Sequence, residues 1–98
     1  MKLLSEPFSF QWDKGNVDKN LKKHNVSNSE VEEIFYDKHK KLFTDRLHSG
    51  NEERLRIIGK TKKDRLLFIV FTIRDKKVRV ISARNLNKKE VYLYEKKT

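Results

Sequence analysis

Three apolar segments separated by short polar turns constrain the fold of this chain more than any other feature of its 98 residues. The segments, rich in Leu, Ile, Val and Phe, are residues 54–60, 66–73 and 77–84. The turns between them occupy 61–64 and 74–76, and strands joined by such short connections pair as an antiparallel meander. The middle segment is apolar without interruption from 66 to 71, which predicts a central strand covered on both faces.

Two helices are predicted between the N-terminus and the meander. Residues 8–12 alternate aromatic and polar side chains, as a half-buried strand does. Asp13 is then the expected N-cap of a helix over 14–23 with a thin apolar stripe. Ser27 and Glu30 form a capping-box pattern, which predicts the start of a second helix. That helix presents one apolar face, formed by Val31, Ile34 and Phe35.

The remaining elements are short. The polar connection before the meander is expected to contain a strand at 42–43 and a turn at 49–51. After the last strand, Asn87 and Glu90 predict a capped helix over 88–95. The expected order is β-α-α-β-β-β-α. This is an α+β fold in which two N-terminal helices pack on an antiparallel meander sheet and a short C-terminal helix follows.

Composition excludes several classes of function. The chain has no cysteine, so disulfides, thiolate zinc sites and a cysteine nucleophile are ruled out. His24, His39 and His48 lack the spacing of metal ligands, and we expect no metal or other cofactor. No apolar run approaches the roughly 18 residues of a membrane span, and the N-terminus is too short for a signal peptide. We expect a single cytoplasmic domain over residues 1–98 that does not bind a membrane.

The net charge of +10 is concentrated in the second half of the chain. Residues 1–49 hold nine basic and eight acidic side chains, whereas residues 50–98 hold fifteen and six. Such an uneven field attracts polyanions, namely RNA or DNA, or an acidic partner protein. The alternative is that the lysines only make a small surface soluble.

Strand alternation predicts that several arginines share one face of the sheet. Tight turns at 62–63 and 75–76 would pair Ile57 with Phe68 and place Thr72 opposite Arg79. The face toward the helices would then hold Leu55, Ile57, Phe68, Val70, Ile81 and Ala83. The other face would hold Arg54, Arg56 and Arg84 around Ile58, Leu67, Ile69, Phe71 and Val80. Because solubility alone does not require three arginines on a half-apolar surface, this face is predicted to be electropositive.

Three of the basic residues have both a structural and a functional interpretation. Arg84 ends the third apolar segment, where its planar fork suits a phosphate. An ion pair with Glu90 or Asp13 would equally account for an arginine there. Lys23 and His24 end the first predicted helix, where they either complement its dipole or contact phosphate, with His24 as a general base.

Several short motifs follow one another between residues 8 and 95. They are Phe-x-Trp-Asp at 10–13, Asn-x-x-Lys-His-x-Val at 20–26, an acidic helix ending in Phe at 30–35, Arg-x-x-x-x-Gly at 54–59, Thr-x-Arg at 72–74, Ile-Ser-Ala-Arg at 81–84, and then Glu90 and Tyr94. In this order they resemble the BrnT family, toxins of type II toxin–antitoxin systems with a RelE-like fold. The chain departs from the family where Asn85 and Leu86 replace Arg and Ala, and where Val91 replaces a basic residue.

The resemblance implies a ribonuclease that inhibits translation and is neutralised by a BrnA-type antitoxin, a small ribbon-helix-helix protein. RNA cleavage without metal requires a deprotonated 2′-hydroxyl, stabilised phosphorane charge and a protonated 5′-oxygen. Arg84 and Arg54 are expected to bind the scissile phosphate. Lys23 would add positive field, and Tyr94 or His24 would exchange protons. Further RNA contacts are expected from Arg56, Arg74 and Arg79.

Two other classes of function stay open. The domain is either a non-catalytic nucleic-acid-binding module with the same basic face, or a protein-interaction domain that meets only an acidic partner. RNA cleavage measured with and without EDTA separates the enzyme from the binding module. Salt-dependent RNA affinity separates the binding module from the interaction domain. A homodimer is also left open.

Overall fold

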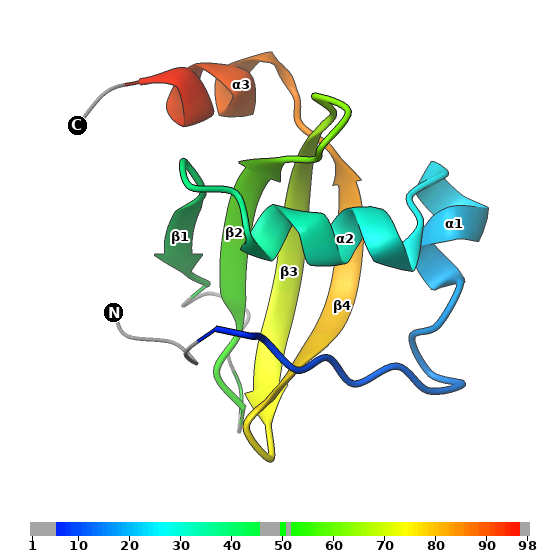
Figure 1. Ribbon diagram of the computed structural model, residues 1–98. Helices are drawn as coiled ribbons and strands as arrows, with labels where there is room; N and C mark the ends of the chain where they lie inside the picture. The colour runs from blue at the N-terminus through cyan, green and yellow to red at the C-terminus, as the bar shows by residue number, and fades with distance from the viewer. Residues whose placement is uncertain (1–5, 46–49, 51, 97–98) are drawn as a thin grey trace.

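A four-stranded antiparallel sheet forms the centre of the computed structural model, which describes residues 6–45, 50 and 52–96 (Figure 1). The strands lie side by side in chain order: β1 (Lys41–Thr44), β2 (Leu55–Lys60), β3 (Leu66–Arg74) and β4 (Lys77–Asn85). The helices are α1 (Lys19–His24), α2 (Asn28–Phe35) and α3 (Lys88–Glu95). The predicted α+β class and the antiparallel meander are therefore confirmed. Residues 49 and 51 of the expected turn lie outside the described residues.

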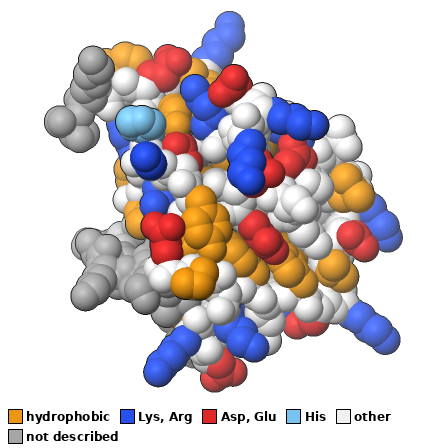
Figure 2. Space-filling view, in the orientation of Figure 1, with side chains coloured by type: hydrophobic (Ala, Val, Ile, Leu, Met, Phe, Trp, Pro, Cys, Tyr) orange, Lys and Arg blue, Asp and Glu red, His pale blue; other side chains and the backbone are white. Residues whose placement is uncertain are grey.

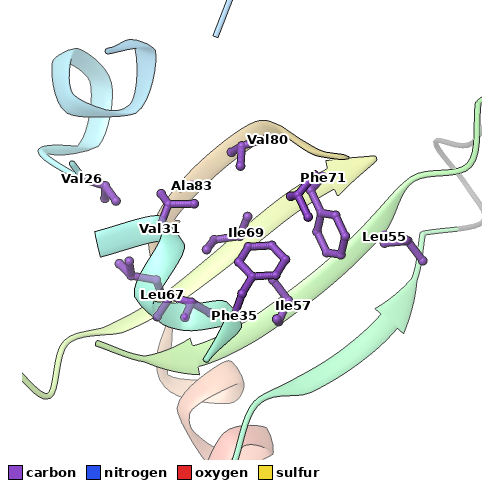
Figure 3. Close-up of a cluster of buried hydrophobic side chains, with 12 residues drawn as sticks. Val26, Val31, Phe35, Leu55, Ile57, Leu67, Ile69, Phe71, Val80 and Ala83 are labelled. Atoms are coloured by element: carbon purple, nitrogen blue, oxygen red, sulfur yellow. The ribbon is translucent and has the colours of Figure 1, made fainter. Parts of the chain in front are cut away.

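Helix α2 crosses one face of the sheet (Figure 1), and its apolar residues Val31, Ile34 and Phe35 are buried there. The capping box is formed as predicted, because Ser27 Oγ accepts from the Glu30 amide while the Glu30 carboxylate accepts from the Ser27 amide. Phe35 is fully buried, and its ring meets Phe71 edge-on with 5.0 Å between centroids. Figure 3 shows the core between α2 and this inner face of the sheet, with Leu55, Ile57, Leu67, Ile69, Phe71 and Ala83 pointing toward the helix.

The register of the first hairpin differs by one residue from the sequence expectation. Ile57 pairs with Ile69 rather than Phe68, because the connection occupies 61–65 and Thr61 donates its amide to the Arg65 carbonyl. A slip of one residue turns every side chain of a strand to the opposite face. Odd-numbered residues of β3 therefore face α2, and Phe68 lies on the outer face.

The second hairpin has the expected tight turn and an unexpected β-bulge. Asp75 and Lys76 both have positive φ, as a two-residue type I′ turn requires. Thr72 pairs with Arg79 as predicted, but the register shifts at Val70, which pairs with Ser82. Ile81 is the extra residue of the bulge. The outer face of the sheet consequently carries Phe43, Arg56, Ile58, Phe68, Val70, Ser82 and Arg84.

The first helix is much shorter than the predicted span of 14–23. Asp13 caps a turn by accepting from the Gly15 amide, and α1 begins six residues later at Lys19. The two apolar side chains of its stripe, Val17 and Leu21, are exposed, so the segment has no apolar face to bury. It is attached instead through Asn20, whose buried Oδ1 accepts from the Ala83 amide at 2.9 Å.

Backbone groups along the free edge of β4 are bonded to the N-terminal segment. The expected strand at 8–12 is an extended segment with one parallel bridge, between Phe10 and Val78. Val78 donates to the Ser9 carbonyl and accepts from the Gln11 amide, both at 2.8 Å. Asn16 extends this coverage by donating from Nδ2 to the Val80 carbonyl. These contacts occupy backbone donors and acceptors that would otherwise be unpaired at the edge of the sheet.

Helix α3 lies across the end of the sheet where β2 and β4 terminate (Figure 1). The Asn87–Glu90 capping box is formed as predicted. Tyr94 is buried, and its hydroxyl donates to Asp37 Oδ2 at 2.6 Å. Lys41 Nζ donates to the carbonyls of Leu93, at 2.5 Å, and Lys96. No helix in the described ranges has the length and apolarity to span a membrane.

Replacing Gly59 with alanine tests the close packing of α2 on β2. A Cβ at this position would lie 2.7 Å from Ile34 Cγ2 and 3.2 Å from the Ile34 carbonyl oxygen. We expect the free energy of unfolding to fall by about 1–3 kcal/mol, the usual cost of overpacking. Urea denaturation measures the change. Gly50→Ala is the control, since its Cβ would have no atom within 4 Å, and an equal cost for both variants would contradict the interpretation.

Replacing Tyr94 with phenylalanine tests the attachment of α3. Loss of the hydroxyl donor should lower the free energy of unfolding by about 1–2 kcal/mol near neutral pH. Partial burial opposes ionisation of Asp37, but hydrogen bonds from Tyr94 and two backbone amides prevail, so the folded-state pKa lies below its usual 3.8. The contribution is thus present above that pH and is lost as the pH falls through the folded-state pKa. Urea unfolding at about pH 7 and about pH 3 should show a smaller cost at low pH; the same cost at both would refute this account.

Candidate functional site

Arg84 is held rigidly on the outer face near the end of β4. Its guanidinium lies over the ring of its cross-strand partner Phe68, with Cζ 4.2 Å from the centroid. Glu90 of α3 accepts two hydrogen bonds from the fork, Nη1 to Oε1 and Nη2 to Oε2, both at 2.8 Å. These bonds raise the pKa of Arg84 and lower the pKa of Glu90. The ion pair with Glu90 was one of the two structural alternatives for Arg84, and it is the one that forms.

The Arg84 side chain nevertheless stays accessible. It is 38% exposed, whereas the carboxylate that holds it is 15% exposed. A fixed, permanently charged guanidinium that is open to solvent suits the bidentate binding of a phosphate.

Arg56 lies on the same outer face, on the central strand β2. The ladders place it beside Phe43 of β1 and Val70 of β3, while Arg84 is level with Phe68. The prediction that Arg56 and Arg84 share a face is therefore confirmed. Of the apolar residues predicted around them, Ile58 lies on this face, but the register slip puts Leu67, Ile69, Phe71 and Val80 on the inner face.

Three other arginines gather at the opposite end of the sheet. Arg74 forms a bidentate pair with Glu52, with Nε to Oε2 at 2.6 Å, and Arg79 forms one with Asp13. Each arginine lowers the pKa of its carboxylate partner. Arg54 lies one residue before β2, and its charge adds to the lowering at Glu52. Arg54 thus stands four residues from the level of Arg84, about 13 Å along the strand.

Lys23 and His24 lie at the end of α1, and both are exposed. Their position is fixed by Arg65, which the sequence patterns did not single out. Its guanidinium donates to the His24 carbonyl at 3.2 Å and to the Asn25 carbonyl at 2.7 Å. The same side chain also binds Glu30 of the capping box and Asn85 at the end of β4. The end of α1 is therefore tied to the residue next to Arg84.

Tyr94 is bonded to Asp37 and not to Arg84. It follows Glu90 by one turn of α3, but its hydroxyl donates to Asp37 in the connection between α2 and β1. Burial and the neighbouring Asp37 carboxylate raise the pKa of Tyr94. The side chain is thus a poor proton acceptor in this arrangement. It is not brought together with Lys23 and His24.

Charged side chains lie on both sides of the sheet. On the side that α2 covers, Figure 2 shows basic and acidic side chains interspersed rather than gathered by sign. The outer face instead presents Arg56 and Arg84 among the rings of Phe43 and Phe68. In the described part of the chain, no group of three His, Asp or Glu side chains is arranged to hold a metal ion.

Comparison with known proteins identifies the family of the chain. The profile described as "Ribonuclease toxin, BrnT, of type II toxin-antitoxin system" matches residues 12–90. No curated protein matches. The matched span includes all four strands, both arginines of the outer face and the Lys23–His24 pair, but it ends before Tyr94. Because it covers most of the chain, the protein belongs to the BrnT family of ribonuclease toxins of type II toxin–antitoxin systems.

Proposed function

We propose that this chain is an endoribonuclease that cleaves RNA without a metal and thereby inhibits translation in the cytoplasm. The outer face of the sheet binds the RNA. The observation that carries the proposal is the placement of Arg84, which is fixed on Phe68, held by Glu90 and still accessible. Membership of a ribonuclease toxin family supports the same substrate class.

Arg84 acts on the charge that develops at the phosphate. Attack by the 2′-oxygen forms an O2′–P bond and breaks the P–O5′ bond, with a proton leaving the 2′-hydroxyl and another reaching the 5′-oxygen. The phosphorane between these steps carries more negative charge on its oxygens than the ground state does. A preorganised guanidinium stabilises that charge more than it stabilises the substrate, so it accelerates the reaction.

His24 is the better candidate than Tyr94 for proton exchange. The exposed His24 lies at the end of α1 that Arg65 ties to Asn85, next to Arg84. Tyr94 already donates to Asp37. Lys23 adds positive field beside His24. The remaining predicted contacts, Arg54, Arg56, Arg74 and Arg79, bind RNA phosphates or bases outside the scissile position.

A cognate antitoxin of the BrnA type, a ribbon-helix-helix protein, would cover the outer face. A toxin must be silenced in the cell that makes it, and occupation of Arg84 blocks the phosphate directly. Acidic side chains of the antitoxin would replace Glu90 on Arg84 or meet Arg56. Such pairing speeds association and makes affinity fall with added salt.

Cleavage of a defined RNA in EDTA tests the role of Arg84. Arg84→Ala should lower the rate by roughly two to three decades, because loss of one such donor typically costs about 3–4 kcal/mol. Arg84→Lys should recover little, since a point charge does not replace the planar fork. Lys76→Gln is the control: it removes a positive charge from the β3–β4 turn at the far end of the sheet, so it should retain most of the rate.

Circular dichroism establishes that each variant is folded before its rate is interpreted. Equal rates for the wild-type chain and a folded Arg84→Ala variant would remove Arg84 from the mechanism. A loss in Tyr94→Phe as large as that in Arg84→Ala would move proton transfer to Tyr94. A wild-type chain that binds RNA without cleaving it would favour the non-catalytic binding module.

The affinity of the chain for the purified antitoxin tests whether the antitoxin covers the outer face. The dissociation constant should rise with salt, and Arg84→Ala should raise it about 30-fold or more, as loss of one partner of a buried charge pair does. Lys76→Gln removes a charge from the β3–β4 turn at the far end of the sheet and should have little effect. Calorimetric titration measures the dissociation constants of the wild-type chain and of the two variants. Equal affinities for the two variants would place the antitoxin on another surface.

A further inference from the structure

A small pocket opens on the outer face between Arg56 and helix α3. Its volume is about 110 Å³, and its lining residues are Phe43, Arg56, Ile58, Phe68, Glu90 and Leu93. An apolar cavity of about 150 Å³ accommodates benzene, so this smaller, half-open space admits only the edge of a ring while the rest of the ligand stays outside. The pocket therefore has the size for the inserted edge of a planar ring system.

The pocket walls are suited to an aromatic ligand. Phe43 and Phe68 contribute rings from β1 and β3, and Ile58 is buried between them on β2. Unstacked nucleobases bind to such phenylalanine surfaces, because every base has a π face. Phe68 is also the ring that carries the Arg84 guanidinium. A base in the pocket would thus lie next to the phosphate position proposed above.

Arg56 supplies a hydrogen-bond donor that has no partner. Its Nε is buried and makes no hydrogen bond to any described residue, and its Nη2 reaches the Thr44 carbonyl only at 3.4 Å. Native proteins rarely leave a buried donor unpaired, so an unpaired one beside a cavity points to a ligand acceptor. Its charge acts on Glu90 across the pocket and helps to lower the pKa of that carboxyl.

Glu90 supplies a spare acceptor on the other side. A carboxylate has about four lone-pair sites, and the described contacts use three of them. Arg84 donates one hydrogen bond to each oxygen, and the Asn87 amide donates to Oε1. Oε2 therefore retains one site. The pocket combines a free arginine donor, a free carboxylate acceptor and two aromatic rings.

We infer that this pocket binds a guanine base of the RNA, next to the phosphate on Arg84; the inference rests on the function proposed above. An arginine fork matches the O6 and N7 acceptors of guanine, the commonest specific arginine–base contact. The N1–H donor beside O6 then meets the remaining site on Glu90. Adenine and cytosine turn an amino group toward the arginine, and uracil offers it no second acceptor on that edge.

Binding of short 2′-O-methyl oligonucleotides tests this inference, because these probes are not cleaved by attack of a 2′-oxygen. Four oligouridylates, with G, A, C or U at one central position, are titrated by fluorescence anisotropy. The G oligonucleotide should bind about 5- to 100-fold more tightly than the others. Arg56→Gln should abolish this preference. Lys76→Gln removes one positive charge elsewhere and should lower all four affinities slightly while keeping the preference.

The outcomes separate this inference from the proposed function. Equal binding of all four probes by the wild-type chain, or preference for another base, overturns the guanine pocket and leaves RNA binding intact. A preference that survives in folded Arg56→Gln overturns it as well. Absence of binding to every probe at low salt overturns both proposals. Arg56→Lys gives a further check: it keeps the charge, so loss of preference with retained salt dependence supports recognition by the guanidinium fork.

Discussion

The size of the hydrophobic core is limited by the apolar surface that the short helix α2 can cover. Helix α2 has eight residues, and its apolar side covers only the inner face of the sheet. The fit is tight at Gly59, where no Cβ would fit beside Ile34. The outer face therefore stays half-buried, and the guanidinium groups of Arg56 and Arg84 lie over its rings, Phe43 and Phe68. The same constraint that gives a small core leaves aromatic and cationic groups accessible on the outer face.

The strands and both capping boxes were predictable because their causes are local. The apolar segments between polar turns predicted β2, β3 and β4 to within one residue at each end. Register was not predictable, since it depends on a loop hydrogen bond at Thr61 and on the bulge at Ile81. No residue pattern in the sequence indicates either the loop hydrogen bond or the bulge. The first helix was overestimated because Val17 and Leu21 looked like a buried stripe, whereas Asn20 makes the attachment.

The candidate site was partly predictable, because part of it also depends on local sequence patterns. Arg56 and Arg84 follow from strand alternation, which holds along β2 and, beyond the bulge at Ile81, at the end of β4. Arg65 and Asp37 could not be found, because their partners lie far along the chain: Arg65 joins His24 to Asn85, and Asp37 accepts from Tyr94. In the sequence, Arg65 and Asp37 are single polar residues in connecting segments. Their several hydrogen-bond partners come together only in the folded chain.

The hydrogen bonds along the edge of β4 also limit where a strand of another chain can be added. The Val78 amide and carbonyl, the Val80 carbonyl and the Ala83 amide are all bonded to the N-terminal segment or to α1. A strand from another molecule cannot be added there unless it first displaces that segment. Strand addition by a partner, and aggregation by edge-to-edge pairing, are thereby directed to the outer edge of β1.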